Sequence, residues 1–519
     1  MTGSLVAKAN RRPSMTVAEA AAAPVRDVDR IVLPPANIVH EREKIAERWP
    51  AAVRFIEDAR LNEHFGAADG DIGVIVQGGL FNTLNRALEL LGLSDPFGAS
   101  RVPVYCLNVT YPLIPAEVAA FCAGKRAVLV VEEGQPEFIE HELNTLLRRA
   151  DLQTRVVGKD LLPRAGEYTA TVLIEGLRRF LDAWAPDLEV RPAAAPDPVP
   201  PAAAGAVPPR PPGFCTGCPE RPIFTAMKLV ERELGPRHVS ADIGCHLFSI
   251  LPPFDIGNTT MGYGLGPAGA SAFKTSGRRA IAVMGDGGFW HNGLTSGVGN
   301  AVFNQDDAVT LVVDNGYAAA TGGQAIPSSR GDNALRVTRN PIERAIRGVG
   351  ATWVRTVERT YDVAQMRDVL KAALTAPDRG PKFIVAQSEC MLNRERREKP
   401  AREKAIASGV RVTRERFGVD PDTCTGDHSC IRLSGCPSLS VKANPDPLKT
   451  DPVAHVDNSC VGCGLCGEVS HAAVLCPSFY RARIVQNPTR WDRFVQGVRR
   501  AVIGAWQRQA ARALAARSF

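Results

Sequence analysis

Two apolar runs that each end in small or polar residues constrain the fold of this chain most strongly. The first run, Ala280–Met284, leads directly into Gly285-Asp286-Gly287, and the second, Ala308–Val313, leads into Asp314-Asn315. The stretch between them, Leu294–Phe303, has the apolar periodicity and the length of a crossover helix. We therefore expect a β-α-β unit in a parallel sheet, which brings both strand ends to one edge, where such folds bind ligands.

The residues expected at that edge have the chemistry of a magnesium diphosphate site. Glycines leave the backbone open to a diphosphate, and Asp286 and Asn315 offer the hard oxygen ligands that Mg²⁺ prefers. Together with the glycine-rich segment Thr321–Gln324, this pattern resembles the diphosphate-binding motif of thiamine-diphosphate enzymes. The sequence therefore predicts thiamine diphosphate and Mg²⁺ as cofactors.

Length and charge exclude several other classes of protein. A chain of 519 residues is long enough for about three or four domains, and none of its apolar runs reaches the length of a membrane span. The net charge of +7 lies in the tail, because the residues from Tyr480 onward hold nine arginines against one aspartate. The rest is close to neutral, which argues against a nucleic-acid partner.

The 13 cysteines are the second strong signal. They occur in clustered Cys-x-x-Cys spacings, and no secretory apolar segment precedes them, so a disulfide framework is not expected. Cysteines grouped in this way in a reducing compartment are typical of metal or iron–sulfur ligands. We therefore expect a cytoplasmic protein that holds 4Fe-4S clusters.

Two groups near the C-terminal end follow the ferredoxin pattern. Bacterial two-cluster ferredoxins repeat Cys-x2-Cys-x2-Cys-x3-Cys-Pro, and the fourth cysteine of each copy ligates the other cluster. Crossed ligation of this kind predicts one cluster held by Cys436, Cys460, Cys463 and Cys466, and another held by Cys424, Asp427, Cys430 and Cys476. Structural zinc is the alternative for Cys-x-x-Cys pairs. The two Cys-Pro partners, in the right order, favour iron and sulfur.

Asp427 stands where the first copy of the motif has its second cysteine. Three outcomes are open at this position. Asp427 could ligate iron through oxygen, the site could hold a three-iron cluster, or the loop could be degenerate and empty.

Four further cysteines lie around the cofactor motif: Cys215, Cys218, Cys245 and Cys390. Their grouping in one domain predicts a third cluster, close to the thiazolium ring of the cofactor. The alternatives are zinc or no ligand for Cys215 and Cys218, and plain core packing for the other two. Cys106 and Cys122 are expected to be packing residues.

Strand-like and helical stretches alternate in two parts of the chain, which predicts a multidomain α/β fold with parallel sheets, a small two-cluster ferredoxin-like module and a C-terminal helix. The expected domains are a remnant, irregular N-terminal segment (1–70), an α/β domain resembling the C-terminal domain of transketolase (71–190), a Pro/Ala linker (191–213), a thiamine-diphosphate-binding α/β domain (214–392), a charged connector (393–420), a ferredoxin-like domain (421–480) and a basic amphipathic helix (481–519). That helix could lie on a membrane surface, dock on a partner, serve as a calmodulin-like target, or pack on its own domain.

With these residues assembled, the chain resembles the thiamine-diphosphate (alpha) subunit of indolepyruvate:ferredoxin oxidoreductases, in the 2-oxoacid:ferredoxin oxidoreductase superfamily. The resemblance runs from about Arg30 to the end, and the motifs that carry it are Phe214-Cys-Thr-Gly-Cys-Pro219, Ser240-Ala-Asp-Ile-Gly-Cys245, Gly285-Asp-Gly-Gly288, Asp314-Asn315 and Cys460-Val-Gly-Cys-Gly-Leu-Cys466. It implies that Mg²⁺ is bound by Asp286, Asn315 and the backbone carbonyl of Tyr317. The residues expected to contact the cofactor are Gly285, Asp286, Gly287, Gly288, Asn315, Cys245 and His246.

The resemblance also implies an activity. It is the oxidative decarboxylation of arylpyruvates such as indolepyruvate to the aryl-acyl-coenzyme A, with ferredoxin as electron acceptor. Coenzyme A, ferredoxin and a second oxidoreductase subunit are the implied partners, in an oligomer. A non-oxidative thiamine decarboxylase or lyase, and a non-catalytic electron-transfer subunit, are the alternatives.

The chain departs from this family in two ways. Glu220 follows Cys218-Pro219 in the first motif, where family members often have His. The family also has a pyrimidine-binding domain that supplies the glutamate activating the cofactor, and residues 1 to about 70 are too few to hold it. We therefore name no catalytic residue in this chain, and we expect a partner or a separately encoded segment to supply that glutamate.

Overall fold

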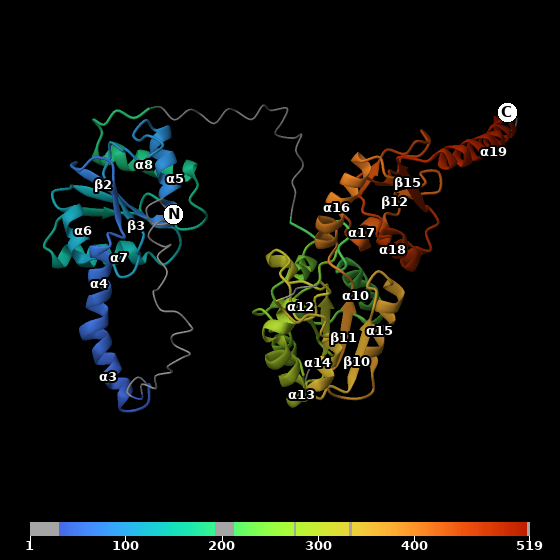
Figure 1. Cartoon of the computed structure of the whole chain (residues 1–519), viewed down its shortest axis with the longest axis horizontal. Coiled ribbons are helices and arrows are strands. Elements are labelled where there is room, and N and C mark those ends of the chain that lie inside the picture. The colour runs from blue at the N-terminus through green and yellow to red at the C-terminus, as the bar shows by residue number, and fades with distance from the viewer. Residues whose placement is uncertain (1–27, 29–30, 192–211, 275–276, 332–334, 516–519) are drawn as a thin grey trace. The chain divides into compact units, whose positions relative to one another are not determined.

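The computed structural model describes residue 28 and residues 31–191, 212–274, 277–331 and 335–515. The chain divides into two compact units, Met1–Pro208 and Pro209–Phe519, and each is described by itself (Figure 1). Most of the predicted linker, residues 191–213, lies outside the described residues, as do the first 27 residues and the last four.

The first unit is built on a five-stranded sheet with the order β1-β3-β2-β4-β5. Strands β2 to β5 are parallel, and β1 pairs antiparallel with β3. One buried cluster packs residues of α5 and α8 against the sheet, and another packs α6 and α7, so helices cover both faces. The bounds of these elements are β1 Glu63–Phe65, β2 Ile72–Gln77, α5 Phe81–Leu90, β3 Val104–Leu107, α6 Pro115–Cys122, β4 Ala127–Val131, α7 Phe138–Arg149, β5 Arg155–Val157 and α8 Ala170–Trp184.

The N-terminal segment differs from the expectation of an irregular remnant. Helices α3 (Ala36–Glu43), η2 (Lys44–Arg48) and α4 (Trp49–Asp58) follow one another, and β1 then joins the sheet. Good helix formers such as Ala, Glu and Arg dominate this stretch, and Ile56 gives α4 one buried contact. The expectation was therefore wrong for residues 36–65.

The second unit holds a six-stranded sheet, order β10-β11-β9-β8-β6-β7, in which every pairing is parallel. Its strands are β6 Val239–Ala241, β7 Thr259–Thr260, β8 Ile281–Gly285, β9 Val309–Asp314, β10 Trp353–Val357 and β11 Lys382–Gln387. Its helices include α10 Arg221–Leu234, η4 Cys245–Ile250, α11 Gly266–Ser271, α12 Asp286–Gly288, η5 Phe289–Gly299, α13 Asn300–Phe303, α14 Ile342–Gly348 and α15 Val363–Thr375. The predicted β-α-β unit is confirmed, because β8 and β9 are neighbours and helical residues 286–303 connect them.

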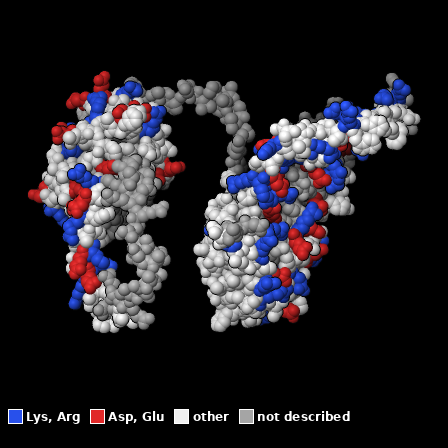
Figure 2. Space-filling model, viewed as in Figure 1, with Lys and Arg blue, Asp and Glu red and all other residues white. Residues whose placement is uncertain are grey.

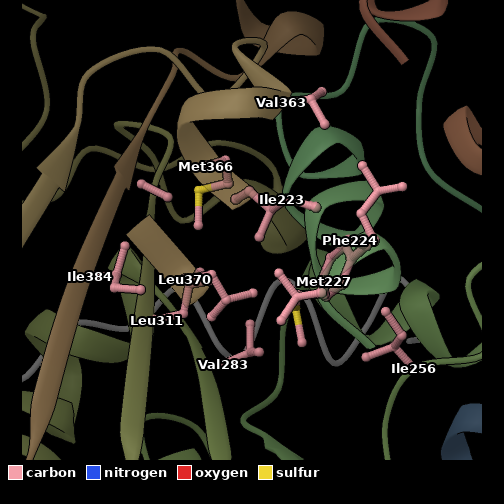
Figure 3. Packing of buried hydrophobic residues seen from close by; sticks show 14 of the residues in the cluster. Ile223, Phe224, Met227, Ile256, Val283, Leu311, Val363, Met366, Leu370 and Ile384 are labelled. Atoms are coloured by element: carbon pink, nitrogen blue, oxygen red, sulfur yellow. The ribbon is translucent and has the colours of Figure 1, made fainter. Parts of the chain in front are cut away.

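The largest core of this unit lies between the sheet and two helices. Ile223 and Met227 of α10 and Met366 and Leu370 of α15 pack onto strand residues such as Leu311 (Figure 3). Burial of these aliphatic side chains stabilises the unit by about 1.5–3 kcal/mol for each fully buried residue. On the opposite face, η5 and α14 pack against the same strands. The multidomain α/β fold class is thus confirmed.

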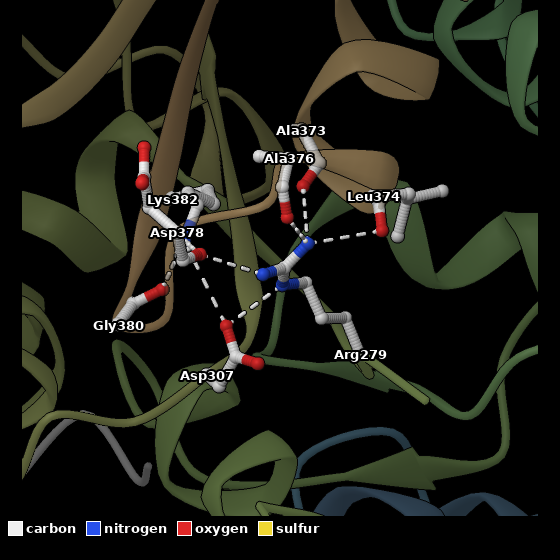
Figure 4. A network of polar contacts seen from close by, with 8 residues as sticks. All are labelled: Arg279, Asp307, Ala373, Leu374, Ala376, Asp378, Gly380 and Lys382. Atoms are coloured by element: carbon white, nitrogen blue, oxygen red, sulfur yellow. Dashed lines mark hydrogen bonds and ion pairs between the residues drawn. The ribbon is translucent and has the colours of Figure 1, made fainter. Parts of the chain in front are cut away.

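A polar network closes the amino ends of the central strands (Figure 4). Arg279 donates from Nε to Asp307 at 2.7 Å, and its two other nitrogens donate to backbone carbonyls that include those of Ala376 at 2.6 Å and Asp378 at 2.7 Å. Lys382, which opens β11, donates to the carbonyls of Gly380 and Asp378 at 2.6 and 2.7 Å. These bonds tie the starts of β8, β9 and β11 together and leave the opposite edge of the sheet free for a site.

The cysteine-rich module follows helix α16 (Met391–Ala407). It contains a ribbon of β12 (Val412–Val419) and β15 (Phe479–Gln486), a second ribbon of β13 (Leu439–Lys442) and β14 (Val453–Val456), and helices α17 (Ser429–Ser434) and α18 (Leu465–Val474). The expected charged connector, residues 393–420, contains most of helix α16 and the whole of strand β12. Residues 481–486, expected in the C-terminal helix, instead extend a strand because they pair with β12.

The C-terminal helix α19 (Arg490–Ala515) begins at a bidentate ion pair in which Arg411 donates to Asp492. Its apolar residues remain exposed, with Trp491, Phe494 and Trp506 at 70%, 61% and 67%. Lys and Arg residues line the visible face of this region (Figure 2). Packing of the helix on its own domain, one of the open alternatives, is therefore wrong for the described residues. No helix in the described parts of the chain has both the length and the apolar character needed to cross a bilayer.

Candidate functional site

A cavity of about 240 Å³ lies at the carboxyl edge of strands β6, β8 and β9. It is placed by the parallel topology, because each of these strands ends in a turn that faces the same edge. Its lining includes all seven residues predicted to contact the cofactor: Gly285, Asp286, Gly287, Gly288, Asn315, Cys245 and His246. Tyr317 also lines it.

Asp286 is a buried acceptor in the wall of this cavity and is only 1% exposed. One carboxylate oxygen accepts from the backbone N–H of Gly287 at 2.8 Å, and the other accepts from Gly316 at 2.6 Å and Tyr317 at 3.2 Å. The Tyr317 N–H also lies 3.3 Å from Oδ1 of Asn315. The turns after β8 and β9 thus bring Asp286, Asn315 and Tyr317 together, as the β-α-β pattern predicts.

The electrostatics of Asp286 suit a cation. Burial raises the pKa of its carboxyl well above the ordinary range, and the nearby Asp314 and Glu220 raise it further. A divalent ion among these oxygens would offset the cost of a buried negative charge.

The glycines after Asp286 are required by close approach. A Cβ on Gly287 would collide with the Tyr263 hydroxyl, and one on Gly288 would collide with a carboxylate oxygen of Asp242. The backbone of Gly287 and Gly288 therefore lines the cavity without side chains. This cradle, together with the buried carboxylate, fits an Mg²⁺-bound diphosphate.

Asp242 and His246 form a buried pair in the wall of this site. His246 Nε2 lies 2.7 Å from Asp242 Oδ1, and the other oxygen of Asp242 accepts from the Gly264 N–H at 2.8 Å. Burial alone would lower the pKa of His246, but the hydrogen bonds to Asp242 and the negative charges of Asp242 and Glu220 together outweigh it, so the pKa is raised. The pair fixes the imidazole against the turn at Gly285. The sequence analysis missed Asp242 as a functional residue, although the motif that contains it was a usable signal.

Glu220 also faces the cavity, at 3% exposure. Its Oε1 accepts from the Asn315 side-chain amide at 3.3 Å, whereas Oε2 has no hydrogen-bond partner in the described part of the chain. Burial raises the pKa of this carboxyl, and His246 partly opposes the shift. Glu220 therefore holds one of the predicted Mg²⁺ ligands in place and offers an unpaired oxygen to the site.

A second, narrower cavity adjoins the first, and Cys215, Cys218, Cys245 and Cys390 all line it. Glu220, Cys245 and Asn315 belong to the walls of both cavities. Burial raises the pKa of the Cys245 thiol to about 12, and the neighbouring Cys390 and Cys215 thiols contribute to the shift. The fold thus gathers the four cysteines of the predicted proximal cluster beside the cofactor cavity.

The seven cysteines of the cysteine-rich module fall into the two groups that crossed ligation predicts. Burial raises the pKa of the Cys466 thiol, and the thiols of Cys463, Cys436 and Cys460 raise it further. The pKa of Cys430 is raised to about 11 by burial, with contributions from Cys424, Cys476 and Asp427. Each group therefore contains one cysteine from the other copy of the motif.

Asp427 already has a structural role in the loop before α17. Its two carboxylate oxygens accept from the backbone N–H of Ser429 at 3.1 Å and from the Ser429 hydroxyl at 2.9 Å. These bonds to the residue two positions on stabilise the turn that leads into α17. An iron ligated by Asp427 would have to share the carboxylate with them.

None of the His, Cys, Asp and Glu side chains in the described ranges forms a group of three or more arranged to hold a single metal ion. This arrangement is compatible with both predicted kinds of site. The Mg²⁺ site has one carboxylate and takes the rest of its ligands from amide, carbonyl and substrate oxygens. An iron–sulfur cluster spreads its thiolates over several irons, so the sulfurs need not converge on one point.

Comparison with known proteins agrees with this geometry. Residues 242–386 match the family model described as thiamine pyrophosphate enzyme, C-terminal TPP binding domain. The chain is 30% identical over 469 residues to the indolepyruvate oxidoreductase subunit IorA of Methanothermobacter thermautotrophicus, with 87% of this chain and 67% of that protein covered. It is 28% identical over 462 residues to the IorA subunit of Thermococcus kodakarensis, with 86% and 66% covered.

The chain therefore spans about two thirds of the length of the curated relatives it matches. Among solved structures, the 2-oxoglutarate:ferredoxin oxidoreductase from Magnetococcus marinus is similar at 22% identity and a TM-score of 0.31, over 36% of this chain and 66% of that chain.

Proposed function

The chain belongs to the family of indolepyruvate oxidoreductase IorA subunits, and from this we propose that it is the thiamine-diphosphate subunit of a 2-oxoacid:ferredoxin oxidoreductase. The proposed reaction is the oxidative decarboxylation of an arylpyruvate, indolepyruvate first, to the acyl-coenzyme A with ferredoxin as acceptor. The proposed assembly contains a second oxidoreductase subunit.

One observation carries this proposal: the cofactor cavity and the cavity lined by four cysteines share a wall. Cys245, Glu220 and Asn315 belong to both. A non-oxidative thiamine enzyme has no use for four thiols gathered at this position. Electrons released in the larger cavity would have only this wall to cross.

The residues of the larger cavity would bind and orient the cofactor. Asp286, Asn315 and the Tyr317 carbonyl would hold Mg²⁺, and the bare turn Gly285–Gly288 would receive the diphosphate. When bound, thiamine diphosphate supplies the carbon nucleophile and the electron sink that decarboxylation of a 2-oxoacid requires. The Asp242–His246 pair keeps one imidazole fixed beside the diphosphate turn.

The cysteine groups would hold the electron carriers. We propose that Cys215, Cys218, Cys245 and Cys390 bind the proximal cluster. We further propose that Cys436, Cys460, Cys463 and Cys466 bind a second cluster, and that Cys424, Asp427, Cys430 and Cys476 bind a third. Single-electron carriers of this kind suit transfer to ferredoxin, which accepts one electron at a time.

The alternative is a subunit that only transfers electrons. The intact Gly-Asp-Gly cradle and the buried oxygen ligands favour a cofactor-binding subunit instead. Both functions predict iron, so iron alone does not separate them.

The test is anaerobic reduction of a viologen dye by the purified chain together with its second subunit, thiamine diphosphate, Mg²⁺ and coenzyme A. A pyrimidine-binding domain is added in trans in one arm. We expect reduction that depends on indolepyruvate and on thiamine diphosphate. Iron-containing protein that binds no thiamine diphosphate and reduces no dye in any arm would identify an electron-transfer subunit.

A further inference from the structure

Arg221 is among the largest fully buried side chains of the described chain, at 0% exposure. It opens helix α10, directly after the Cys215–Pro219 loop. Its Nη1 donates to the backbone carbonyl of Ser434 at 3.0 Å. Its other two nitrogens, Nε and Nη2, have no hydrogen-bond partner among the described residues. Arg221 is thus a fully buried charged group with two donor nitrogens that have no hydrogen-bond partner among the described residues.

This arrangement is costly unless a negative charge accompanies it, because an unpaired buried charge destabilises a fold. Burial alone would lower the pKa of Arg221, but the thiols of Cys436, Cys218 and Cys463 raise it. The bond to Ser434, two residues before Cys436, places the guanidinium beside these cysteines, whose thiols carry negative charge only as thiolates.

The three thiols belong to two different cysteine groups. Cys218 lies in the proximal group, and Cys436 and Cys463 lie in the first group of the cysteine-rich module. The loop that carries Cys218 packs directly on that module. The Thr216 hydroxyl lies 3.4 Å from that of Ser438, and a Cβ on Gly217 would collide with Val461. Arg221 thus lies between the two groups.

We propose that Arg221 is a buried counter-cation for the iron–sulfur cluster of Cys436, Cys460, Cys463 and Cys466, and that it favours electron transfer to this cluster from the proximal one. The proposal rests on the proposed function, since it requires clusters at these cysteines. In the transfer, the proximal cluster loses one electron and the second cluster gains it, and no bond is made or broken. A fixed positive charge stabilises the more negative, reduced cluster, so it raises the reduction potential.

Arginine suits this role better than lysine. Its guanidinium stays protonated in a protein interior and presents donors in a fixed plane, so one can bind Ser434 while the others face sulfur. The charge is therefore constant at any working pH.

The experiment compares Arg221→Met, which keeps the length and removes the charge, with Arg221→Lys, which keeps the charge. Arg232→Met is the matched control, because Arg232 is exposed on the same helix. Each variant is prepared anaerobically as the full chain with its second subunit. Iron and sulfide are counted, and the clusters are titrated with reductant while electron paramagnetic resonance spectra are recorded.

We expect unchanged iron in Arg221→Met and at least a tenfold fall in the equilibrium constant for reducing one cluster, which is 59 mV for a one-electron couple. Arg221→Lys should recover most of this loss, and Arg232→Met should match the wild type. A full complement of iron with unmoved potentials would overturn the counter-cation role alone. A wild-type complex that binds no iron would overturn the proposed function with it.

A second measurement covers the case in which Arg221→Met assembles no cluster. In cluster-free protein the guanidinium has lost its counter-charge, so its removal should raise the melting temperature of the apo chain above that of the wild-type apo chain. A lower melting temperature would show that Arg221 serves only to hold the module through Ser434.

Discussion

The guanidinium of Arg221 donates to the backbone carbonyl of Ser434 at 3.0 Å, across 213 positions of the sequence. Four positions along α10, the Thr225 hydroxyl donates to the neighbouring Leu433 carbonyl at 2.6 Å. Leu433, Leu465 and Val469 of the cysteine-rich module also belong to the same buried core as α10 and α15. The module is therefore held rigidly on the thiamine domain, which fixes the separation between the cysteine groups.

The first prediction concerns Asp286. Replacing it with Ala removes the carboxylate that the turns at Gly287 and Gly316 enclose. Mg²⁺-dependent binding of thiamine diphosphate should fall at least a hundredfold, as measured by isothermal titration calorimetry with and without Mg²⁺. Asp368→Ala is the control, because Asp368 is exposed on α15, and it should bind as the wild type does. Equal affinity in Asp286→Ala and the control would show that this turn is not the metal site.

Crossed ligation gives the second prediction. Cys436→Ala should remove the cluster that otherwise depends on Cys460, Cys463 and Cys466, whereas Cys476→Ala should remove the one that depends on Cys424 and Cys430. Iron analysis of the wild type should give roughly twelve irons per chain if all three sites hold four-iron clusters. If each variant instead loses the signal of its sequence neighbours, ligation is not crossed.

The third prediction concerns the role of Asp427, which is tested by replacing it with the cysteine that the ferredoxin motif has at this position. Asp427→Cys should give its site the spectrum of a full four-iron cluster. The same change removes the two bonds to Ser429, so the turn before α17 should also lose about 1 kcal/mol of stability. A spectrum that does not change at all would identify the loop as empty.

Arg279 gives a prediction about stability. Arg279→Met removes the ion pair to Asp307 and the hydrogen bonds to several partly buried carbonyls (Figure 4). The free energy of unfolding of the second unit should fall by about 3 kcal/mol, as measured by denaturant unfolding. Arg367→Met, which breaks a surface pair with Asp368, should cost no more than about 0.5 kcal/mol. Equal effects of the two changes would contradict the structural role of the network.

Cys106 and Cys122 give a prediction about pH. Burial raises the pKa of each thiol to about 12, so neither forms a thiolate near neutral pH in the folded state. Mass spectrometry should show both unmodified by iodoacetamide in native, iron-free protein, while the exposed Cys215 reacts. Because the unfolded thiols ionise at lower pH, the stability that these groups contribute should be lost as pH rises from about 9 to 12. Rapid labelling of either thiol in the native state would contradict their burial.

The sequence was most informative where chemistry and local periodicity coincide. The runs before Gly285 and Asp314 predicted adjacent parallel strands, and the spacing of the cysteines predicted which of them the fold brings together. Both patterns can be recognised from residues that lie close together in the sequence. For the two strands, parallel pairing is sufficient to place their carboxyl ends on one edge of the sheet.

Long-range packing could not be predicted from the sequence. In the sequence, Arg221 is an ordinary charged residue at the start of a helix. The structure shows that it is fully buried and that it donates to the carbonyl of Ser434. The ribbon of β12 and β15 was missed because its strands lie about sixty residues apart and alternate charged with half-buried residues. Helices α3 and α4 were missed because they bury only one residue, Ile56, so no core-facing stripe marks them in the sequence.

We propose that electrons pass from the thiamine cavity to the cysteine groups across their shared wall. This proposal is tested most directly by mixing indolepyruvate, under anaerobic conditions and without an external acceptor, with the complex loaded with thiamine diphosphate and Mg²⁺. The account predicts bleaching of the iron–sulfur absorbance in the wild-type complex and none in Asp286→Ala with full iron content. Release of carbon dioxide with the clusters still oxidised would contradict it.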